Sequence, residues 1–390
     1  MRHLANIENM SPLLKSIAPP LLSLVFMMMA SGLFNTFVSV RLEMEGYSAE
    51  SIGVVTSALY LGITIGSLRI DRWVSKIGHI RSFVAFAAIL AMVVLAQAFW
   101  IDPWYWSMLR FIGGICMAGV FIVIESWLLM QSLPEMRGAV LSTYLAVLYV
   151  ALSSGQLLID VSNPHGVFPF FITAMLVVVS ILPITIRKIL TPKLTEHPRL
   201  NFIQLFRISP HGFFGGVVSG MMLAAIYGLV PVYAKEIGMS VSEIGTFMAI
   251  LIFGGFSLQW PLGLLADKMG RRRILNIVSF TTALLAILIA LFGSTSFPLL
   301  YILACLFGGF SFTLYPISMA YACERVQEGQ IVAATGGFVL SYGIGAVVGP
   351  LLAPIAMSLF ANDGLFYFLA MISLMLGLIG LKRPSPAMIK

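Results

Sequence analysis

Charged side chains are scarce in this chain. Asp, Glu, Lys and Arg make up 10% of its 390 residues, whereas 59% are hydrophobic, and the mean hydropathy is +0.98. A soluble protein of this length could not keep so much apolar surface away from water. Apolar runs of about 20 residues, the length that crosses a bilayer, recur from end to end. The composition therefore excludes a soluble protein and predicts an all-α integral membrane protein.

Cysteine and histidine are also few. The three cysteines (Cys116, Cys305 and Cys323) have no paired spacing, so neither a disulfide framework nor a metal site is expected. All five histidines fall in terminal or loop positions of the expected topology, which argues against a histidine proton relay. No phosphate-binding loop and no nucleophile motif is present. We therefore expect no enzyme activity, no cofactor and no metal.

The hydrophobic runs predict twelve transmembrane helices. The first 17 residues are polar and no small-residue cleavage site follows the first run, so we expect that helix to serve as the insertion signal. The spans are expected at 18–42, 50–70, 80–101, 103–131, 138–160, 167–187, 211–234, 244–266, 274–294, 298–322, 331–359 and 364–381.

The basic residues orient the chain. With both termini in the cytoplasm, all but three of the 23 lysines and arginines lie on that side, as the positive-inside rule requires. The exceptions are Arg41 and Lys235, expected in outer loops, and Arg110, expected within a helix. The net charge of +7 is thus a topology signal rather than a sign of nucleic-acid binding. We expect a monomer with the lipid bilayer as its partner.

The two halves of the chain repeat each other. Residues 46–53 parallel residues 238–245 at an offset of 192, and Gly155 parallels Gly349 at 194. The same relation joins Asp71 to Asp267 and the glycine pair 113–114 to the pair 308–309. We therefore expect a six-helix bundle at 1–187, a cytoplasmic linker at 188–210 and a second six-helix bundle at 211–390. Such parallel repeats place a binding site near the membrane midplane.

Three motifs carry a family resemblance over essentially the full chain. They are Gly263-x-x-x-Asp267-Lys-x-Gly270-Arg-Arg-Arg, Arg110-x-x-Gly113-Gly114 and Gly336-x8-Gly345-x3-Gly349-Pro350. With these motifs the chain resembles the major facilitator superfamily, which implies the twelve-helix fold of that family and a solute transporter. The second motif resembles one associated with proton-coupled members, and the third resembles an antiporter motif.

Two departures from the family pattern stand out. The N-terminal copy of the first motif is longer by four residues between Asp71 and Gly78. The glycine motif lies in the eleventh span rather than the fifth, and it ends in Ala353-Pro354. Residues 69–83 and 125–128 also look like those of the bacterial YcaD-like subgroup of the superfamily, which implies a location in the inner membrane of a bacterium.

The charged turns are expected to form a cytoplasmic gate. In each turn an acid lies at a helix end beside several bases, and such exposed pairs contribute about 0–1 kcal/mol each. A latch built from them breaks readily, although the bases alone would also fix topology. The expected gate residues are Asp71, Arg72, Asp267, Arg271, Arg272, Glu324 and Arg325.

Arg110 lies about 10 Å into the fourth helix, counted from Pro103 at 1.5 Å per residue. At that depth its charge must face water, an acid or backbone carbonyls, so it should point into the protein. It either binds an anionic solute or holds neighbouring helices together. Glu125 is the best proton-coupling candidate, because it is the only acid well inside a span. Alternatively, it forms a salt bridge with Arg72, Lys76 or Arg137.

The midplane offers amide and aromatic side chains. They suit a neutral or amphipathic solute, or an anion held by Arg110, although aromatic residues in membrane helices also serve plain packing. In the eleventh span, Gly336, Gly345, Gly349 and Pro350 are expected to permit close packing and a bend. The expected cavity residues are Asn35, Arg110, Tyr149, Tyr227, Gln259, Trp260, Tyr315 and Tyr342.

Together these features predict a secondary active transporter of a small organic solute. It works by alternating access and is coupled to protons, with efflux slightly favoured over uptake. The alternative is a non-transporting sensor or lipid-handling protein on the same fold.

Overall fold

A computed structural model describes residues 2–132, 136–161, 163–186, 205–206, 208–324 and 331–381. Side chains are described from residue 17 onward, except those of 331–333 and 362. Arg325 and most of the expected linker 188–210 lie outside the described residues.

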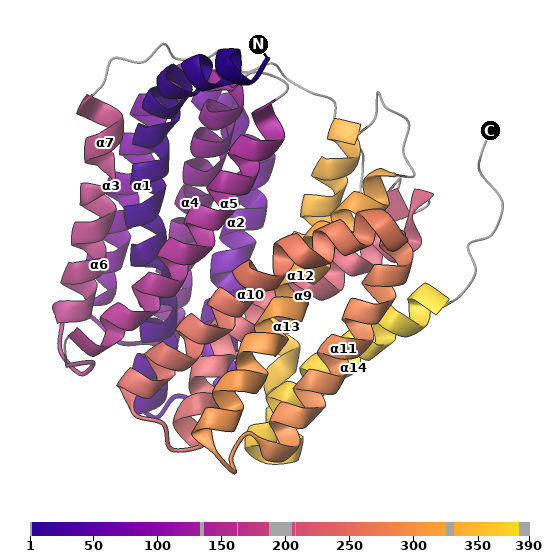
Figure 1. Ribbon diagram of the computed structural model, residues 1–390. Coiled ribbons are helices and arrows are strands. Elements are labelled where there is room, and N and C mark those ends of the chain that lie inside the picture. The colour runs from indigo at the N-terminus through magenta and orange to yellow at the C-terminus, as the bar shows by residue number, and fades with distance from the viewer. Residues whose placement is uncertain are drawn as a thin grey trace. The chain divides into compact units, whose positions relative to one another are not determined.

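Within the described residues all regular secondary structure is helical (Figure 1). Twelve stretches there are long and apolar enough to cross a membrane, as predicted. One of them joins α5 to η2, and another joins α6 to α7. The helices are α1 (Arg2–Met44), α2 (Ala49–Ile77), α3 (His79–Gln97), α4 (Pro103–Gln131), α5 (Arg137–Gln156), η2 (Leu157–Val161), α6 (Phe168–Val179), α7 (Ile181–Ile186), α9 (Pro210–Glu236), α10 (Val241–Met269), α11 (Arg271–Phe292), α12 (Phe297–Cys323), α13 (Ile331–Phe360), η4 (Ala361–Asp363) and α14 (Gly364–Leu381).

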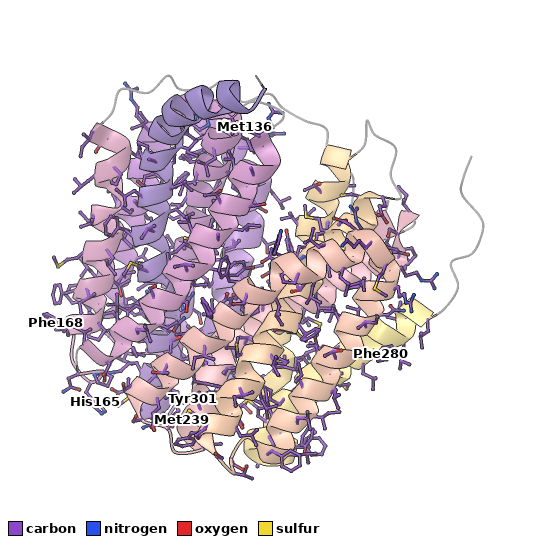
Figure 2. The ribbon with its side chains drawn as sticks, viewed as in Figure 1. Met136, His165, Phe168, Met239, Phe280 and Tyr301 are labelled. Carbon is purple, nitrogen blue, oxygen red and sulfur yellow. The ribbon has the colours of Figure 1, made fainter. Side chains whose placement is uncertain are left out.

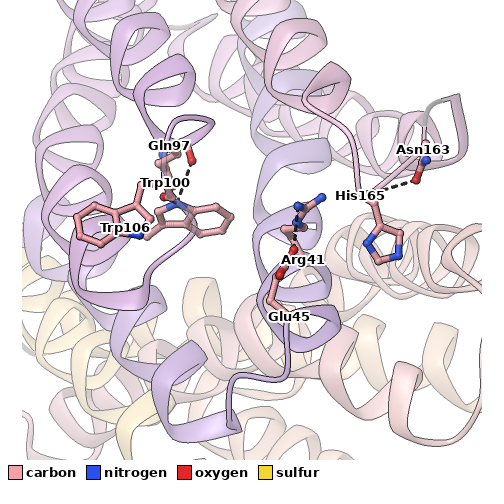
Figure 3. A network of polar contacts seen from close by, with 7 residues as sticks. All are labelled: Arg41, Glu45, Gln97, Trp100, Trp106, Asn163 and His165. Carbon is pink, nitrogen blue, oxygen red and sulfur yellow. Dashed lines mark hydrogen bonds and ion pairs between the residues drawn. The ribbon is translucent and has the colours of Figure 1, made fainter.

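The helices extend past the apolar runs that predicted them. Arg41 and Lys235, which we expected in outer loops, lie in the last turns of α1 and α9. A basic residue in a last turn is stabilised by the negative end of the helix dipole. Arg41 is also paired there, because its Nη2 lies 2.8 Å from Glu45 Oε1 (Figure 3).

Local signals set the helix ends. Asp102 accepts a hydrogen bond from the backbone N–H of Tyr105 at 2.8 Å and so caps α4. In the same turn the buried Trp106 donates through Nε1 to the carbonyls of Gln97 and Trp100, at 3.0 and 2.8 Å (Figure 3). These bonds satisfy helix-end groups that would otherwise lack partners.

The chain forms two compact units. The first unit comprises Met1–Phe37 and Gly62–Thr195, and the second comprises Val38–Leu61 and Glu196–Lys390. In the first unit, α3 packs against α4, α6 and α7. Met136, beside the start of α5, and Phe168, which begins α6, lie at opposite ends of this unit (Figure 2). In the second unit, α9 packs against α13, α10 against α12, and α11 against α14.

Glycines bring corresponding helix pairs of the two units into close contact. In the first unit a Cβ at Gly155 of α5 would fall against the carbonyl of Met29 on α1. In the second unit a Cβ at Gly349 of α13 would fall against the carbonyl of Met221 on α9, and Gly345 meets Val217 in the same way. Backbone this close leaves no room for a side chain, which is the small-residue packing typical of membrane helices. The offset of 194 between Gly155 and Gly349 therefore marks the same contact built twice.

Replacement of Gly349 by Ala should destabilise the protein. The new methyl group meets backbone, which cannot rotate away, so we expect a loss of about 1–3 kcal/mol and a lower melting temperature in detergent, followed by intrinsic fluorescence. Gly263→Ala is the matched control, because a Cβ on that helical glycine would meet nothing within 4 Å. Equal melting temperatures for the two variants would contradict the packing argument.

Candidate functional site

Arg110 is buried in the first unit, with 7% of its surface exposed. Its Nη2 donates to Asn35 Oδ1 on α1 at 3.0 Å, and its Cζ lies 5.2 Å from the centre of the Phe34 ring. Asn35 in turn donates through Nδ2 to Ser31 Oγ at 3.3 Å. A guanidinium over an aromatic face is attracted by the ring quadrupole. The side chain thus points into the protein, where an amide and a ring stabilise its charge.

This contact joins two residues that the sequence had suggested separately, Arg110 and Asn35. Phe34 was missed. The available signal was its place beside Asn35 on a helix that packs around a buried arginine, but many aromatic residues occupy similar positions. Arg110 therefore links α1 and α4, and it brings a permanent positive charge into the interior of the first unit.

Glu125 lies in the same helix and has an exposed side chain. The hydroxyl of Tyr144 on α5 donates to its Oε1 at 2.9 Å. Among the residues that the structure describes, Glu125 has no ion pair, so the expected alternative with Arg72, Lys76 or Arg137 is not formed there. Glu125 is instead held by a hydrogen bond from the neutral Tyr144.

Tyr144 could have been found from the sequence by matching depths. Glu125 lies about 9 Å before the end of α4, and Tyr144 lies about 10 Å after the start of α5, at 1.5 Å per residue. Because consecutive helices of a membrane bundle run antiparallel, these positions lie at the same level. The buried Tyr144 is therefore positioned to hold the carboxylate.

Exposure of Glu125 has a physical consequence. An ionised carboxylate on the surface of a span costs several kcal/mol if it faces lipid, so such groups face water or protein. The exposed face of α4 at Glu125 is therefore expected to line an aqueous route. Glu125 is about 22 Å along α4 from Arg110, so the two groups form separate sites.

The second unit places several aromatic side chains in contact with one another. The ring of Tyr315 lies 5.1 Å from that of Tyr342 and 5.2 Å from that of Phe338. Tyr227 meets Phe312 at 5.8 Å. All three pairs have the edge-to-face geometry that aromatic rings prefer. Phe312 and Phe338 were not expected from the sequence.

The expected cavity residues differ in exposure. Trp260 is 74% exposed, whereas the other aromatic and amide residues of that set are partly buried: Asn35, Tyr149, Tyr227, Gln259, Tyr315 and Tyr342.

Arg271 is the centre of the charged turn in the second unit. Its Nη2 lies 3.4 Å from Asp267 Oδ1, and its Nε lies 3.1 Å from Glu324 Oε1. Its Nη1 also donates to the carbonyl of Ala320, in the last turn of α12, at 2.9 Å. Helix C-termini carry partial negative charge and unpaired carbonyls. Arg271 therefore ties the start of α11 to the end of α12.

Arg272 acts in the same way on another helix. Its Nε and Nη2 donate to the carbonyl of Gly380, near the end of α14, at 3.1 and 2.9 Å. The corresponding turn of the first unit differs, because there Asp71 Oδ1 accepts from the backbone N–H of Arg72 at 2.9 Å. The two expected gate segments therefore have the same sequence origin but different contacts.

Comparison with known proteins decides the family. The model of the Major Facilitator Superfamily matches residues 21–210 and 212–389. The chain belongs to the Major Facilitator Superfamily. Membership of this superfamily makes it a multi-pass membrane transporter rather than an enzyme. The resemblance that the three motifs carried is thereby confirmed.

Members of the superfamily with curated sequences include YcaD, an MFS-type transporter, from Escherichia coli strain HS and from strain 55989. Each is 32% identical over 354 residues, which are 90% of this chain and 91% of the relative. The subgroup suggested by residues 69–83 and 125–128 is therefore confirmed.

Solved structures of the superfamily show the same fold. The nucleoside transporter NupG superposes with a TM-score of 0.76 over 94% of this chain and 98% of its own, at 14% identity. A D-xylose-proton symporter gives a TM-score of 0.73 over 94% and 96%, also at 14% identity. At this identity the likeness shows the architecture alone.

Replacement of Arg271 by Ala should destabilise the second unit, because it removes the contacts between the start of α11 and the end of α12. It removes two carboxylate contacts and a charged hydrogen bond to a carbonyl, so we expect a loss of about 1–3 kcal/mol in unfolding free energy. Arg273→Ala is the matched control, because Arg273 is exposed in the same helical turn. Thermal unfolding in detergent measures both, and a drop of equal size in Arg273→Ala would contradict the specific role of Arg271.

Proposed function

We propose that this transporter moves a small organic solute by alternating access and that Glu125 couples the movement to protons. The observation that carries the proposal is the Glu125 carboxylate itself, exposed within a span and held by a tyrosine at 2.9 Å. A carboxylate in a salt bridge is kept ionised by its partner. With a neutral partner it can exchange a proton between the two faces of a transport cycle.

The contact with Tyr144 suits such an exchange. The phenol donates to the ionised carboxylate, and it can accept from the carboxylic acid after protonation, because a hydroxyl does both. The site therefore has a hydrogen bond in either protonation state. Proton uptake need not disrupt the packing of α4 against α5.

Arg110 supports the solute part of the proposal. An arginine cannot release its proton under biological conditions, so it is a fixed charge rather than a carrier. With Asn35 at 3.0 Å, it offers guanidinium and amide donors to polar oxygen atoms. These donors favour a polar or anionic organic solute.

For the direction of transport we propose efflux. The support is the resemblance of the glycine motif of α13 to the antiporter motif, together with its close approach to α9 at Gly345 and Gly349. Proton-driven efflux and uptake use the same coupling group. Measurement of solute flux in both orientations of the gradient separates them.

Glu125→Gln should abolish coupling but keep exchange. The amide preserves shape and a hydrogen bond to Tyr144 but cannot be deprotonated, so accumulation under an imposed proton gradient should fall more than about tenfold. Proteoliposomes with an internal pH dye, supplied with a labelled panel that includes a nucleoside and D-xylose, measure this. Solute counterflow without a gradient should continue.

The matched control for that experiment is Glu50→Gln, which neutralises an exposed acid in the first turn of α2 and should leave accumulation unchanged. Normal gradient-driven accumulation by Glu125→Gln would refute the coupling role. If transport by the unmodified protein continues unchanged after the proton gradient is collapsed, the protein is a facilitator without proton coupling. Binding of panel members without flux would favour a sensor.

Arg110→Ala should abolish transport while membrane insertion and folding continue. It removes the donor to Asn35 and the charge beside Phe34, and neither is needed for the hydrophobic insertion of α4. Arg110→Lys keeps a charge but lacks the planar set of donors, so we expect it to retain a small part of the flux. Flux in proteoliposomes and size-exclusion profiles measure the two effects, and normal flux in Arg110→Ala would remove its assigned role.

A further inference from the structure

His79 occupies a buried position that the sequence alone did not reveal. It was expected in a loop, but it is the first residue of α3 and is 1% exposed. Its Nε2 lies 3.0 Å from Ser126 Oγ on α4, and its ring meets that of Trp127 at 6.4 Å in an edge-to-face arrangement. Residues 69–83 and 125–128, which carry the subgroup likeness, thus contact each other here.

The hydrogen-bond pattern fixes the proton on the ring. Ser126 has a single hydroxyl hydrogen and donates it to the carbonyl of Ile122 at 2.6 Å. Its oxygen must therefore accept from His79, so Nε2 carries the N–H and Nδ1 bears a lone pair. Among the described residues the buried Nδ1 has no hydrogen-bond partner. The neighbouring Trp127 Nε1 is a donor and cannot accept a proton from Nδ1.

The second unit builds the same turn with a permanent cation. Gly78 and Gly270 each have a φ near 90° and each lie immediately before a helix. His79 follows Gly78, and Arg271 follows Gly270. Each first residue then reaches the neighbouring long helix: His79 bonds Ser126 of α4, and Arg271 bonds the carbonyl of Ala320 of α12. At the offset of 195 that relates Gly113 to Gly308, Ser126 corresponds to the residue after Ala320.

The acids that pair with Arg271 have no counterparts beside His79. Asp267 precedes Arg271 by four residues, within one helical turn, whereas the four additional residues place Asp71 eight before His79. The counterpart of Glu324 at the offset of 195 is Leu129. The turn of the first unit therefore suits a neutral ring and not a cation.

The remaining ionisable groups around α3 do not change this. Among the described helices that pack against α3, α4 carries ionisable groups, whereas α6 and α7 have none. Arg110 lies about 24 Å along α4 from Ser126, and Glu125 is bonded to Tyr144. Near the turn itself, Arg69, Arg72 and Lys76 on α2 and Arg81 on α3 are exposed bases, and Asp71 bonds the backbone of Arg72.

We propose that His79 is a pH-responsive latch, which holds the start of α3 against α4 when its ring is neutral and releases it when the ring is protonated. Protonation adds a second N–H at Nδ1 without a described acceptor, and it places a positive charge at the positive end of a helix. Both effects oppose the packed state. The contact is therefore complete when the ring is neutral and is lost on acidification.

The latch adds regulation to transport and is independent of the identity of the solute. It lies on the side predicted to be cytoplasmic, and its acceptor Ser126 is the residue after Glu125. Release of α3 there frees the adjacent part of α4, so acidification loosens the helix that carries the proposed coupling group. The corresponding contact of the second unit, made by Arg271, does not titrate.

The test follows access to Ser82, which is buried one turn after His79 on α3. The full chain in nanodiscs, with Cys116, Cys305 and Cys323 replaced by Ala, carries Ser82→Cys or, as the reference for thiol reactivity, the exposed Ser75→Cys. A water-soluble maleimide labels each introduced thiol. We expect the labelling rate of Ser82→Cys relative to Ser75→Cys to rise about threefold or more from pH 7.5 to 5.5, where most free histidine rings are charged.

The variant His79→Gln tests whether the rise in the labelling rate comes from protonation of His79. Its amide can still donate to Ser126 but cannot be protonated, so the relative rate should stay low at both pH values. His165→Gln, at an exposed loop histidine, is the matched control and should keep the rise. An unchanged rise in His79→Gln, or no rise in the unmodified protein, overturns the proposal.

A second variant keeps the test decisive if His79→Gln fails to fold, as size-exclusion chromatography would show. Ser126→Ala removes the acceptor and leaves the ring, so the relative rate should be high already at pH 7.5. A low, pH-dependent rate in Ser126→Ala would also overturn the proposal. All of these measurements are made without transport, so they stand even if the coupling role of Glu125 is refuted.

Discussion

A charge inside a membrane span needs a partner or water, and this single constraint organises the described structure. The hydrocarbon offers neither, so the few ionisable groups in the spans must find their partners on neighbouring helices. Arg110 bonds Asn35 and lies over Phe34, which joins α4 to α1. Glu125 accepts from Tyr144, which joins α4 to α5. Helix α4 thus carries both charges and acts as the organising element of the first unit.

The two units share backbone features but differ in the side chains that these features position. Glycines with positive φ begin α3 and α11, and glycines bring α5 to α1 and α13 to α9. Because these features depend on the backbone, they survive divergence of the side chains. The side chains do diverge: the first unit has Arg110, Glu125 and His79, whereas the second has edge-to-face aromatic pairs and the permanent cation Arg271. The groups that we propose to exchange protons, Glu125 and His79, therefore both lie in the first unit.

The sequence predicted the twelve spans well because hydropathy alone defines them, and the offsets of the repeat located the turns. It also selected Arg110, Asn35 and Glu125, because polar groups in apolar runs are rare. It did not identify Tyr144 or Phe34 as their partners, since one aromatic among many becomes special only through a contact between helices. His79 was misplaced for a related reason: a polar residue at a helix start reads as a loop unless the neighbouring helix is known to cover it.

The segment between Asp71 and Gly78 is four residues longer than its counterpart in the second unit, and this difference has a physical consequence. Four added residues are about one turn of helix, so the acid moves out of reach of the first residue of α3. A cation at that residue would then lack its counterion, and the neutral imidazole that is found there needs none. The displaced acid and the histidine therefore fit each other: where the second unit has a permanent ion pair, the first unit has a neutral contact that we propose is broken by protonation.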